Sequence, residues 1–304
     1  MSSKSVNQYG SIYKDSFYII WAELVENLKN VFRFLSVSSL FVGITGFFQT
    51  FTGYLLLGVP PNIQICSAVF LMAFGLYSLN KITDIKEDAI NMPERVNFLR
   101  GRRNLAIAYS IVAYLLCILL TFLDNPSSIV VVFVPFIANA LYGSRLIPGL
   151  PRLKDIPVMK NVIVAVSWAL TTTLLPAAHI MSEKFTVALI LYFMLVKAFV
   201  NTALYDVRDV KGDRENKIRT IPVIVGPKKT ILILLAINAT LLPLLIFLDN
   251  NARLLAASLI ISGFACIFYF GMKKNPLAMD LFVDGEWMLT CVIFILLKIV
   301  RLLP

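Results

Sequence analysis

Nine long apolar stretches follow one another along this 304-residue chain, and polar residues gather in the links between them. Most of the stretches have about the 17–25 residues with which an α-helix crosses roughly 30 Å of hydrocarbon. The pattern predicts an all-α integral membrane protein with nine transmembrane helices around a central cavity. The expected spans are 34–57, 63–80, 104–123, 128–143, 158–181, 185–205, 230–247, 254–272 and 287–303. The fourth is short and contains Pro135 and Asn139, so we expect it to be broken or tilted.

The segment before the first span has an amphipathic pattern. Between Lys14 and Phe32, apolar residues recur every three or four positions and charged residues occupy the other faces. This spacing predicts a helix that lies at the membrane interface. Residues 1–13 are polar and lack the pattern of a cleaved signal, so we expect a disordered tail. Residues 14–304 are predicted to form a single polytopic membrane domain.

Lysine and arginine are concentrated in the amino-terminal segment and in the links after the even-numbered spans. The opposite links hold only Lys184 and Arg253. The positive-inside rule therefore predicts a cytoplasmic amino terminus, a carboxyl terminus on the other side, and a multi-pass location in the cell membrane if the source is prokaryotic. The net charge of +10 belongs to one membrane face, where it can contact anionic lipid. No separate basic domain exists for nucleic acid, and no obligate protein partner is indicated.

Cysteine and histidine chemistry is not indicated by this sequence. Cys66, Cys117, Cys266 and Cys291 lie singly within apolar stretches, without the spacing of a zinc site or a disulfide framework. The only histidine, His179, lies near the predicted outer end of the fifth span. We therefore look to carboxylates for the chemistry of the cytoplasmic side.

Two acidic runs lie at the predicted cytoplasmic ends of the second and sixth spans. They resemble each other at an offset of 125 residues, at which Asp84 and Asp88 match Asp209 and Asp213. Steps of four and eight residues turn an α-helix by about 40° and 80°, so each run presents its acids as a stripe on one face. A carboxylate near a bilayer is costly, by roughly 2.5–3.5 kcal/mol at the helix centre, so two matched runs favour a functional role over solvated helix caps.

Carboxylate oxygens from two helices, placed among basic residues, are suited to a hard divalent cation. Mg²⁺ prefers one or two carboxylates per ion and completes its coordination with water and substrate phosphates. The runs therefore predict a metal–phosphate site, with two ions bridging a diphosphate. The expected metal ligands are Asn80, Asp84, Asp88, Asp209 and Asp213, and the expected diphosphate-binding cations are Lys86, Arg208, Lys211 and Arg214.

The two runs also carry motifs of a known family. The first reads Asn80-x3-Asp84-x3-Asp88, then Asn91-x-Pro93-Glu94-Arg95; the second reads Tyr205-Asp206-x2-Asp209-x2-Gly212-Asp213-Arg214, then Lys217-x-Arg219-Thr220-x-Pro222-Val223. The chain thereby resembles the UbiA superfamily of intramembrane prenyltransferases. The resemblance implies that these acids hold Mg²⁺ and the diphosphate of a polyprenyl diphosphate, whose allylic bond ionises to a carbocation that a small acceptor captures. Thr83 and the sequence Asn91-Met-Pro-Glu-Arg depart from the more frequent family pattern.

Two further residues are assigned by this resemblance, and a third by its position. Arg33, just before the first span, resembles an arginine that often precedes the family's first helix. Lys154 lies in a link that resembles the family's short loop over the active site. Tyr142, at the end of the fourth span, is a candidate to shield the carbocation through its ring, or else an interfacial tyrosine.

Lys197 is the most deeply placed cation of the sixth span. It lies eight residues, or about 12 Å, inside the end of that span, and it aligns at steps of four with Asn201 and Tyr205. We expect Lys197 to face the diphosphate or the acceptor as a catalytic residue, with Asn201 and Tyr205 in substrate binding. A structural ion pair is the alternative.

The sequence therefore predicts Mg²⁺-dependent transfer of a polyprenyl group, with an aromatic quinone precursor as the first choice of acceptor. A glycerol-phosphate lipid acceptor, as in archaeal ether-lipid synthesis, is the second choice, because no residue separates the two. A cation transporter is an alternative of another class, although transport sites usually lie at the midplane of the membrane. A CDP-alcohol phosphotransferase is disfavoured because its contiguous aspartate signature is missing.

Overall fold

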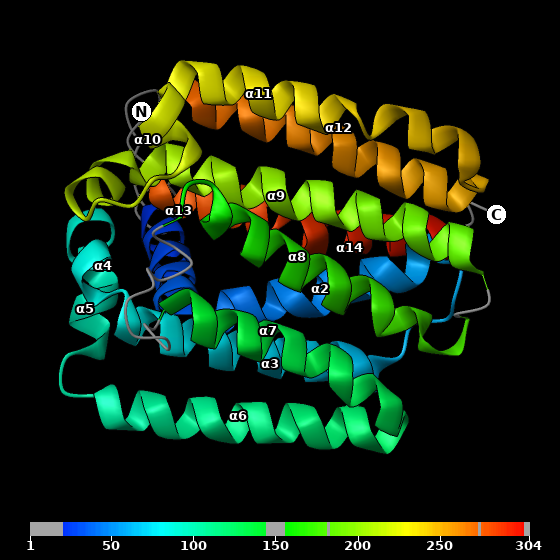
Figure 1. The fold of residues 1–304 in the computed structure, drawn as a ribbon, viewed down its shortest axis with the longest axis horizontal. Coiled ribbons are helices and arrows are strands. Elements are labelled where there is room, and N and C mark those ends of the chain that lie inside the picture. Colours follow the sequence, from blue (N-terminus) through cyan, green and yellow to red (C-terminus); the bar gives the residue numbers. More distant parts are fainter. Residues whose placement is uncertain (1–20, 144–155, 181–182, 273–274, 301–304) are drawn as a thin grey trace, which may run out of the picture.

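The computed structural model describes residues 21–143, 156–180, 183–272 and 275–300, and these residues form helices without a β-strand (Figure 1). The first described helix is Trp21–Val37. The others are α2 (Leu40–Leu56), α3 (Ile63–Thr83), α4 (Ile85–Asn91), α5 (Pro93–Leu99), α6 (Arg103–Asp124), α7 (Ile129–Gly143), α8 (Met159–Leu174), α9 (Lys184–Glu215), α10 (Ile221–Val225), α11 (Pro227–Ala239), α12 (Asn250–Met272), α13 (Pro276–Met279) and α14 (Glu286–Ile299). Short 3₁₀ or π segments are η1 (Pro126–Ser128), η3 (Pro176–His179), η4 (Leu242–Phe247) and η5 (Asp280–Asp284).

The long helices run side by side as a bundle, and the short helices α4, α5, α10 and α13 gather at one end of it, at the left of Figure 1. We call this end the α4–α5 end. Helix α3 packs between α2 and α6, and α8 packs against both α7 and α9. Helix α4 also contacts α9, so the two acidic runs of the sequence are carried by neighbouring elements.

Each of the nine predicted spans falls on a helix of the described chain. Five of these helices are long and apolar enough to cross a membrane, or six if the bent pair Trp21–Val37 and α2 counts as one span. Large apolar side chains also cover the outer faces of the bundle, for example Leu119 and Phe122 on α6 and Phe268 on α12. Such surfaces suit lipid contact. Nine transmembrane helices therefore stay a prediction, whereas several apolar spans are present.

The prediction of one continuous helix over 34–57 is wrong. The first described helix ends at Val37, and α2 begins at Leu40 at an angle of 79° to it. Ser39 adopts a left-handed conformation, with φ of 70°, which is a common way to end a helix. The Lys81 ammonium donates hydrogen bonds to the carbonyl oxygens of Ser36 (3.1 Å) and Val37 (2.7 Å), so it satisfies helix-end acceptors that the break would leave unpaired.

The amphipathic helix thus extends five residues beyond its predicted end at Phe32. Its predicted start at Lys14 and the predicted tail 1–13 lie outside the described residues, and its location at a membrane interface stays a prediction. The described part has exposed apolar residues, including Trp21, Leu24 and Leu28.

Close packing of α2 on α8 depends on Gly53. A Cβ atom at this position would lie 2.1 Å from the carbonyl oxygen of Thr172, so only glycine allows the two backbones to approach this closely. Small residues at helix interfaces are how membrane bundles gain dispersion contacts where the hydrophobic effect is absent. This contact closes the bundle on the side away from the α4–α5 end.

Candidate active site

A cavity of about 290 Å³ enters the bundle at the α4–α5 end. Its walls come from the first described helix, α2, α3, α4, α5, α7, α8, α9, η5 and α14, and its lining changes from charged to mostly apolar along the helices. The apolar part includes Phe41, Met72, Leu76, Trp168 and Trp287. A site of this form can hold a charged group at its mouth and an apolar group inside.

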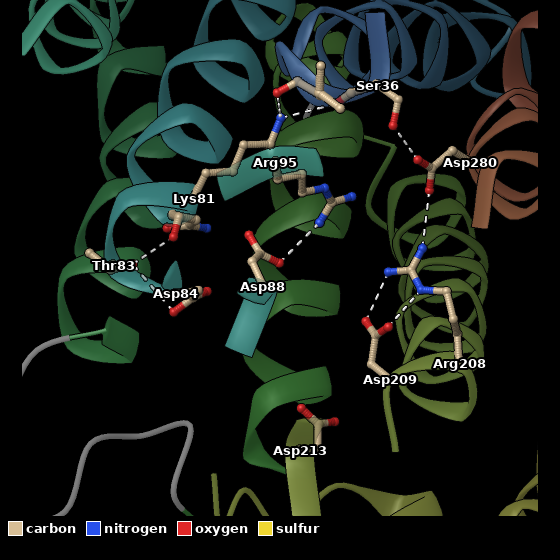
Figure 2. A network of polar contacts seen from close by, with 12 residues as sticks. Ser36, Lys81, Thr83, Asp84, Asp88, Arg95, Arg208, Asp209, Asp213 and Asp280 are labelled. Carbon is tan, nitrogen blue, oxygen red and sulfur yellow. Dashed lines mark hydrogen bonds and ion pairs between the residues drawn. The ribbon is translucent and has the colours of Figure 1, made fainter. Parts of the chain in front are cut away.

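All four aspartates of the two acidic runs line this cavity (Figure 2). Asp84 is the junction residue between α3 and α4, and Asp88 lies one turn further on α4. Asp209 and Asp213 lie on the last turns of α9. The first run therefore crosses a break between two helices, whereas the second belongs to one continuous helix.

A direct hydrogen bond joins the two runs. The backbone N–H of Gly212 on α9 donates to the side-chain oxygen of Asn91 at the end of α4, at 3.1 Å. A Cβ at position 212 would lie 2.4 Å from that amide group, so this contact requires glycine. The contact accounts for the presence of Asn91 and Gly212 in the two motifs, because it fixes α4 against α9.

Cations lie next to acids of both runs, and Figure 2 shows Arg95 beside Asp88 and Arg208 beside Asp209. Asp209 accepts two hydrogen bonds from the Arg208 guanidinium, at 2.7 and 2.9 Å, and Arg208 also reaches Asp280 at 3.4 Å. Asp88 lies 3.6 Å from Arg95, and Asp213 lies 3.4 Å from Lys160. The electrostatic potential is therefore balanced by cations around the cavity mouth, which is what a site for a multiply charged anion and its counter-cations needs.

The carboxyl group of Asp88 shows how this environment acts on an acid of the site. Burial raises its pKa above the ordinary aspartate value, and the charges of Asp84 and Asp209 raise it further, against the lowering effect of Arg95. A divalent cation beside these three acids would favour the ionised form. A cation bound here would therefore offset the repulsion among Asp84, Asp88 and Asp209.

The donor set fits Mg²⁺. Asn80 and the four aspartates all line the same cavity and offer oxygen atoms, the ligands that Mg²⁺ prefers. Within the described residues, no three carboxylate, cysteine or histidine side chains already surround one point. Mg²⁺ needs only one or two carboxylates per ion when water and phosphate oxygens complete its octahedron, so acids spread over two walls are suitable.

The cations that line the cavity are not those that the sequence pattern suggested. Lys86, Lys211 and Arg214 are exposed and lie outside the lining, because each points away from the face that carries the aspartates. Only Arg208 of the predicted set faces the cavity. The other lining cations are Lys81, Arg95 and Lys160.

The predictions for Arg33, Lys154 and Tyr142 have different outcomes. Arg33 lies on the outer side of the bundle, 3.4 Å from Glu94 of α5, and does not line the cavity. Lys154 lies outside the described residues, as does the side chain of Tyr142. Their proposed contacts with substrate stay predictions.

Comparison with known proteins identifies the family. The sequence model of the UbiA prenyltransferase family matches residues 37–280, which include both acidic runs. The chain belongs to the UbiA prenyltransferase family. It is therefore a membrane prenyltransferase.

Curated relatives are named digeranylgeranylglyceryl phosphate synthase. The protein of Methanothrix thermoacetophila is 26% identical over 213 residues, 68% of this chain and 76% of the relative. The protein of Pyrococcus furiosus is 26% identical, over 63% of this chain and 66% of its own length. The protein of Sulfurisphaera tokodaii is 28% identical, over 60% of this chain and 66% of its own length.

Solved structures share the fold. A UbiA homologue from Archaeoglobus fulgidus bound to DMAPP and Mg²⁺ has a TM-score of 0.61 and 15% identity, over 86% of this chain and 99% of that one. A UbiA homologue from Aeropyrum pernix has a TM-score of 0.64 and 17% identity, over 83% and 98%. At these identities the likeness concerns the architecture.

Lys197 of this prenyltransferase does not face the cavity, which corrects the expectation from its position along α9. It is fully buried, and its ammonium lies 2.8 Å from Glu286 of α14 and donates to the Leu259 carbonyl of α12 at 2.9 Å. The partner Glu286 was missed in the sequence because it stands 89 residues away, at the start of the last apolar stretch. Asn201, one turn along α9, donates to the same carboxylate at 2.9 Å and also lines the cavity.

A third pair of acids was also missed. Asp280 and Asp284 on η5 line the cavity, and Tyr205 faces them from α9. Their spacing, Asp280-x3-Asp284, equals that of the two recognised runs. That spacing, placed just before the last apolar stretch, is the signal that could have found them.

Proposed function

We propose that this protein transfers a prenyl group from a prenyl diphosphate to a hydroxyl group of a glyceryl phosphate lipid. The observation that carries the proposal is that two acidic runs, on α3–α4 and on α9, line one cavity whose inner wall is apolar. The charged mouth suits a diphosphate with its cations, and the apolar wall suits an isoprenoid, which gains about 0.8 kcal/mol for each CH₂ removed from water.

The acceptor is inferred from the relatives. The product in their name contains two geranylgeranyl groups on one glyceryl phosphate, so the last step of its synthesis adds a second group to a lipid that carries the first. This evidence favours the glycerol-phosphate acceptor over the aromatic acceptor that was the first choice from sequence. We therefore take geranylgeranylglyceryl phosphate as the acceptor and geranylgeranyl diphosphate as the donor.

Mg²⁺ is the proposed cofactor, with two ions held by Asn80, Asp84, Asp88, Asp209 and Asp213. Homologous structures bound to DMAPP or GPP together with Mg²⁺ support this choice of metal. The bound metal would neutralise the diphosphate and so make it a better leaving group.

The protein's own residues have three tasks in this reaction. Arg95, Lys160 and Arg208 lie beside the acids and can bind diphosphate oxygens that are not bound to Mg²⁺. The wall around Met72 and Trp168 excludes water from the reactive carbon. The motifs are proposed to face the cytoplasm, because the Lys and Arg bias of the links favours that orientation.

A transfer assay tests this function. Purified protein would be given labelled geranylgeranyl diphosphate and Mg²⁺, with either geranylgeranylglyceryl phosphate or 4-hydroxybenzoate as acceptor. We expect the label to enter the glyceryl lipid faster than it enters the aromatic acid. We also expect transfer to require metal, so that EDTA abolishes it and added Mg²⁺ or Mn²⁺ restores it. Transfer to the aromatic acid alone would overturn the acceptor, and full activity in EDTA would overturn the metal.

A further inference from the structure

We propose that Asp284 is the general base that removes the proton of the acceptor hydroxyl, in a polar pocket formed with Thr45, Gln49 and Tyr205. This assignment rests on the function proposed above and adds a catalytic residue to it. Asp284 belongs neither to the first acidic run nor to the second, and lies on the π-helical segment η5, whose five residues lead directly into α14. Such local departures from the α-helix occur frequently at functional sites.

The position of Asp284 relative to the proposed diphosphate site follows from two levels of polar residues between α9 and η5. At the outer level, Arg208 contacts Asp209 at 2.7 Å and Asp280 at 3.4 Å. Tyr205 and Asp284 form the inner level, because Tyr205 lies four residues before Asp209, which is about 6 Å further into the bundle along α9. Both side chains line the cavity, and the Arg208 guanidinium lies 4.9 Å from the centroid of the Tyr205 ring, whose hydroxyl donates to the Met279 carbonyl at 3.5 Å.

The inner level, with Tyr205 and Asp284, is where the reaction needs a base. The diphosphate is assigned to the outer layer of Asp84, Asp88 and Asp209, so the allylic carbon bonded to it lies one step further along the cavity. The acceptor oxygen must approach that carbon from the same inner space. Asp284 lines this part of the cavity, beside Trp287 of α14.

The partners of the other acids single out Asp284. Asp280 is paired with Arg208 and accepts a hydrogen bond from the Ser36 hydroxyl, and Glu286 is paired with Lys197. Among the residues that the structure describes, Asp284 forms no ion pair, and it lines the cavity together with Tyr205. A carboxylate without a bound cation is free to accept a proton, whereas an acid in a bidentate or buried ion pair is not.

A polar acceptor group also finds partners next to Asp284. The Thr45 hydroxyl lies 3.4 Å from the Asp284 carbonyl oxygen, which places α2 against η5 at this level. Gln49, one turn further on the same face of α2, lines the cavity and is 3% exposed. Its side-chain amide offers both a hydrogen-bond donor and an acceptor to a polar ligand group there.

The chemical step balances with the groups present. The bond between the allylic carbon and the diphosphate oxygen breaks, and its electron pair leaves with the diphosphate. The acceptor oxygen forms a new C–O bond with that carbon, and its proton passes to the Asp284 carboxylate. The charged groups that face Asp284 are Asp280 on η5, Arg208 on α9 and Glu286 on α14, the last neutralised by Lys197, and the neutral phenol of Tyr205 faces it from α9.

The variant Asp284→Asn tests the proposal through a split between binding and turnover. With Mg²⁺, we expect the Kd for geranylgeranyl thiodiphosphate to stay within about threefold of wild type, while kcat for transfer to geranylgeranylglyceryl phosphate falls by about 100-fold or more. Asp284→Glu should recover at least about a tenth of the wild-type kcat and shift the acid limb of the kcat–pH profile, which Asp284→Asn should lack.

Asp280→Asn is the matched comparison, one turn nearer the mouth. Because Asp280 contacts Arg208, which also pairs with Asp209, we expect this variant to weaken thiodiphosphate binding. This result would be the opposite of that for Asp284→Asn, which is expected to keep binding and lose turnover. The base assignment is wrong if Asp284→Asn keeps kcat within about threefold of wild type, or if its binding and turnover fall together. A wild-type protein that neither binds the thiodiphosphate with Mg²⁺ nor transfers the prenyl group would refute the proposed function itself.

Discussion

Asp84→Asn and Asp209→Asn are each expected to lower kcat for prenyl transfer by at least about 100-fold. Both changes keep the side-chain shape and remove a negative charge from the layer that would hold the metal–diphosphate complex. Removal of one group that stabilises developing charge typically costs about 2.7–4 kcal/mol of transition-state stabilisation. In Asp209→Asn the Arg208 guanidinium keeps its contact with Asp280, so the local fold should survive.

Asp249→Asn provides a matched control at a site far from the cavity. Asp249 caps α12 by accepting hydrogen bonds from the backbone N–H groups of Asn251 and Ala252, and asparagine can make the same bonds. We expect wild-type kcat for this variant, measured on protein with a normal melting temperature. Wild-type turnover in folded Asp84→Asn or Asp209→Asn would argue strongly against a shared metal site.

Lys197→Met is expected to destabilise the protein by about 3–5 kcal/mol, because it leaves the Glu286 carboxylate buried without its cation. The double variant Lys197→Met/Glu286→Leu should recover most of this loss, since replacement of a buried ion pair by apolar residues is often neutral or stabilising. Lys298→Met, at an exposed position near the end of α14, is the control and should change stability little.

Denaturant unfolding and steady-state kinetics on one detergent preparation distinguish a structural lysine from a substrate-binding one. A structural role predicts lost stability with near-normal kinetics in the protein that stays folded. Normal stability of Lys197→Met with a raised KM or lowered kcat would restore the substrate-facing role expected from sequence. The rescue by Glu286→Leu adds a second criterion, because a substrate-binding lysine would not be rescued in this way.

The acidic runs could be located from sequence because helical periodicity fixes which residues share a face. Tyr205, Asp209 and Asp213 lie on one long helix, and all three line the cavity, as their spacing requires. The same periodicity placed Lys197 on that stripe, yet its ammonium turns toward α12 and α14. A local pattern gives the direction of a Cα–Cβ bond but not the partner that a long, flexible side chain reaches.

The contacts that the sequence did not reveal join residues that are distant in the chain. Lys160 binds Asp206 at 2.7 Å across 46 positions, and Glu286 binds Lys197 across 89. The break before α2 also depends on such a contact, from Lys81 to the helix end at Val37. These pairings follow from how the helices pack, and the spacing of residues along the sequence does not reveal them.

Whether both acidic runs hold one metal–diphosphate complex at the mouth of the cavity can be seen in an experimental structure of the protein with geranylgeranyl thiodiphosphate and Mn²⁺, whose anomalous signal locates the metal. We expect metal between Asp84 or Asp88 and Asp209 or Asp213, bridged by the diphosphate, with the prenyl chain along the wall that includes Met72 and Trp168. Metal and diphosphate bound away from either acidic run would mean that the two runs do not form one site.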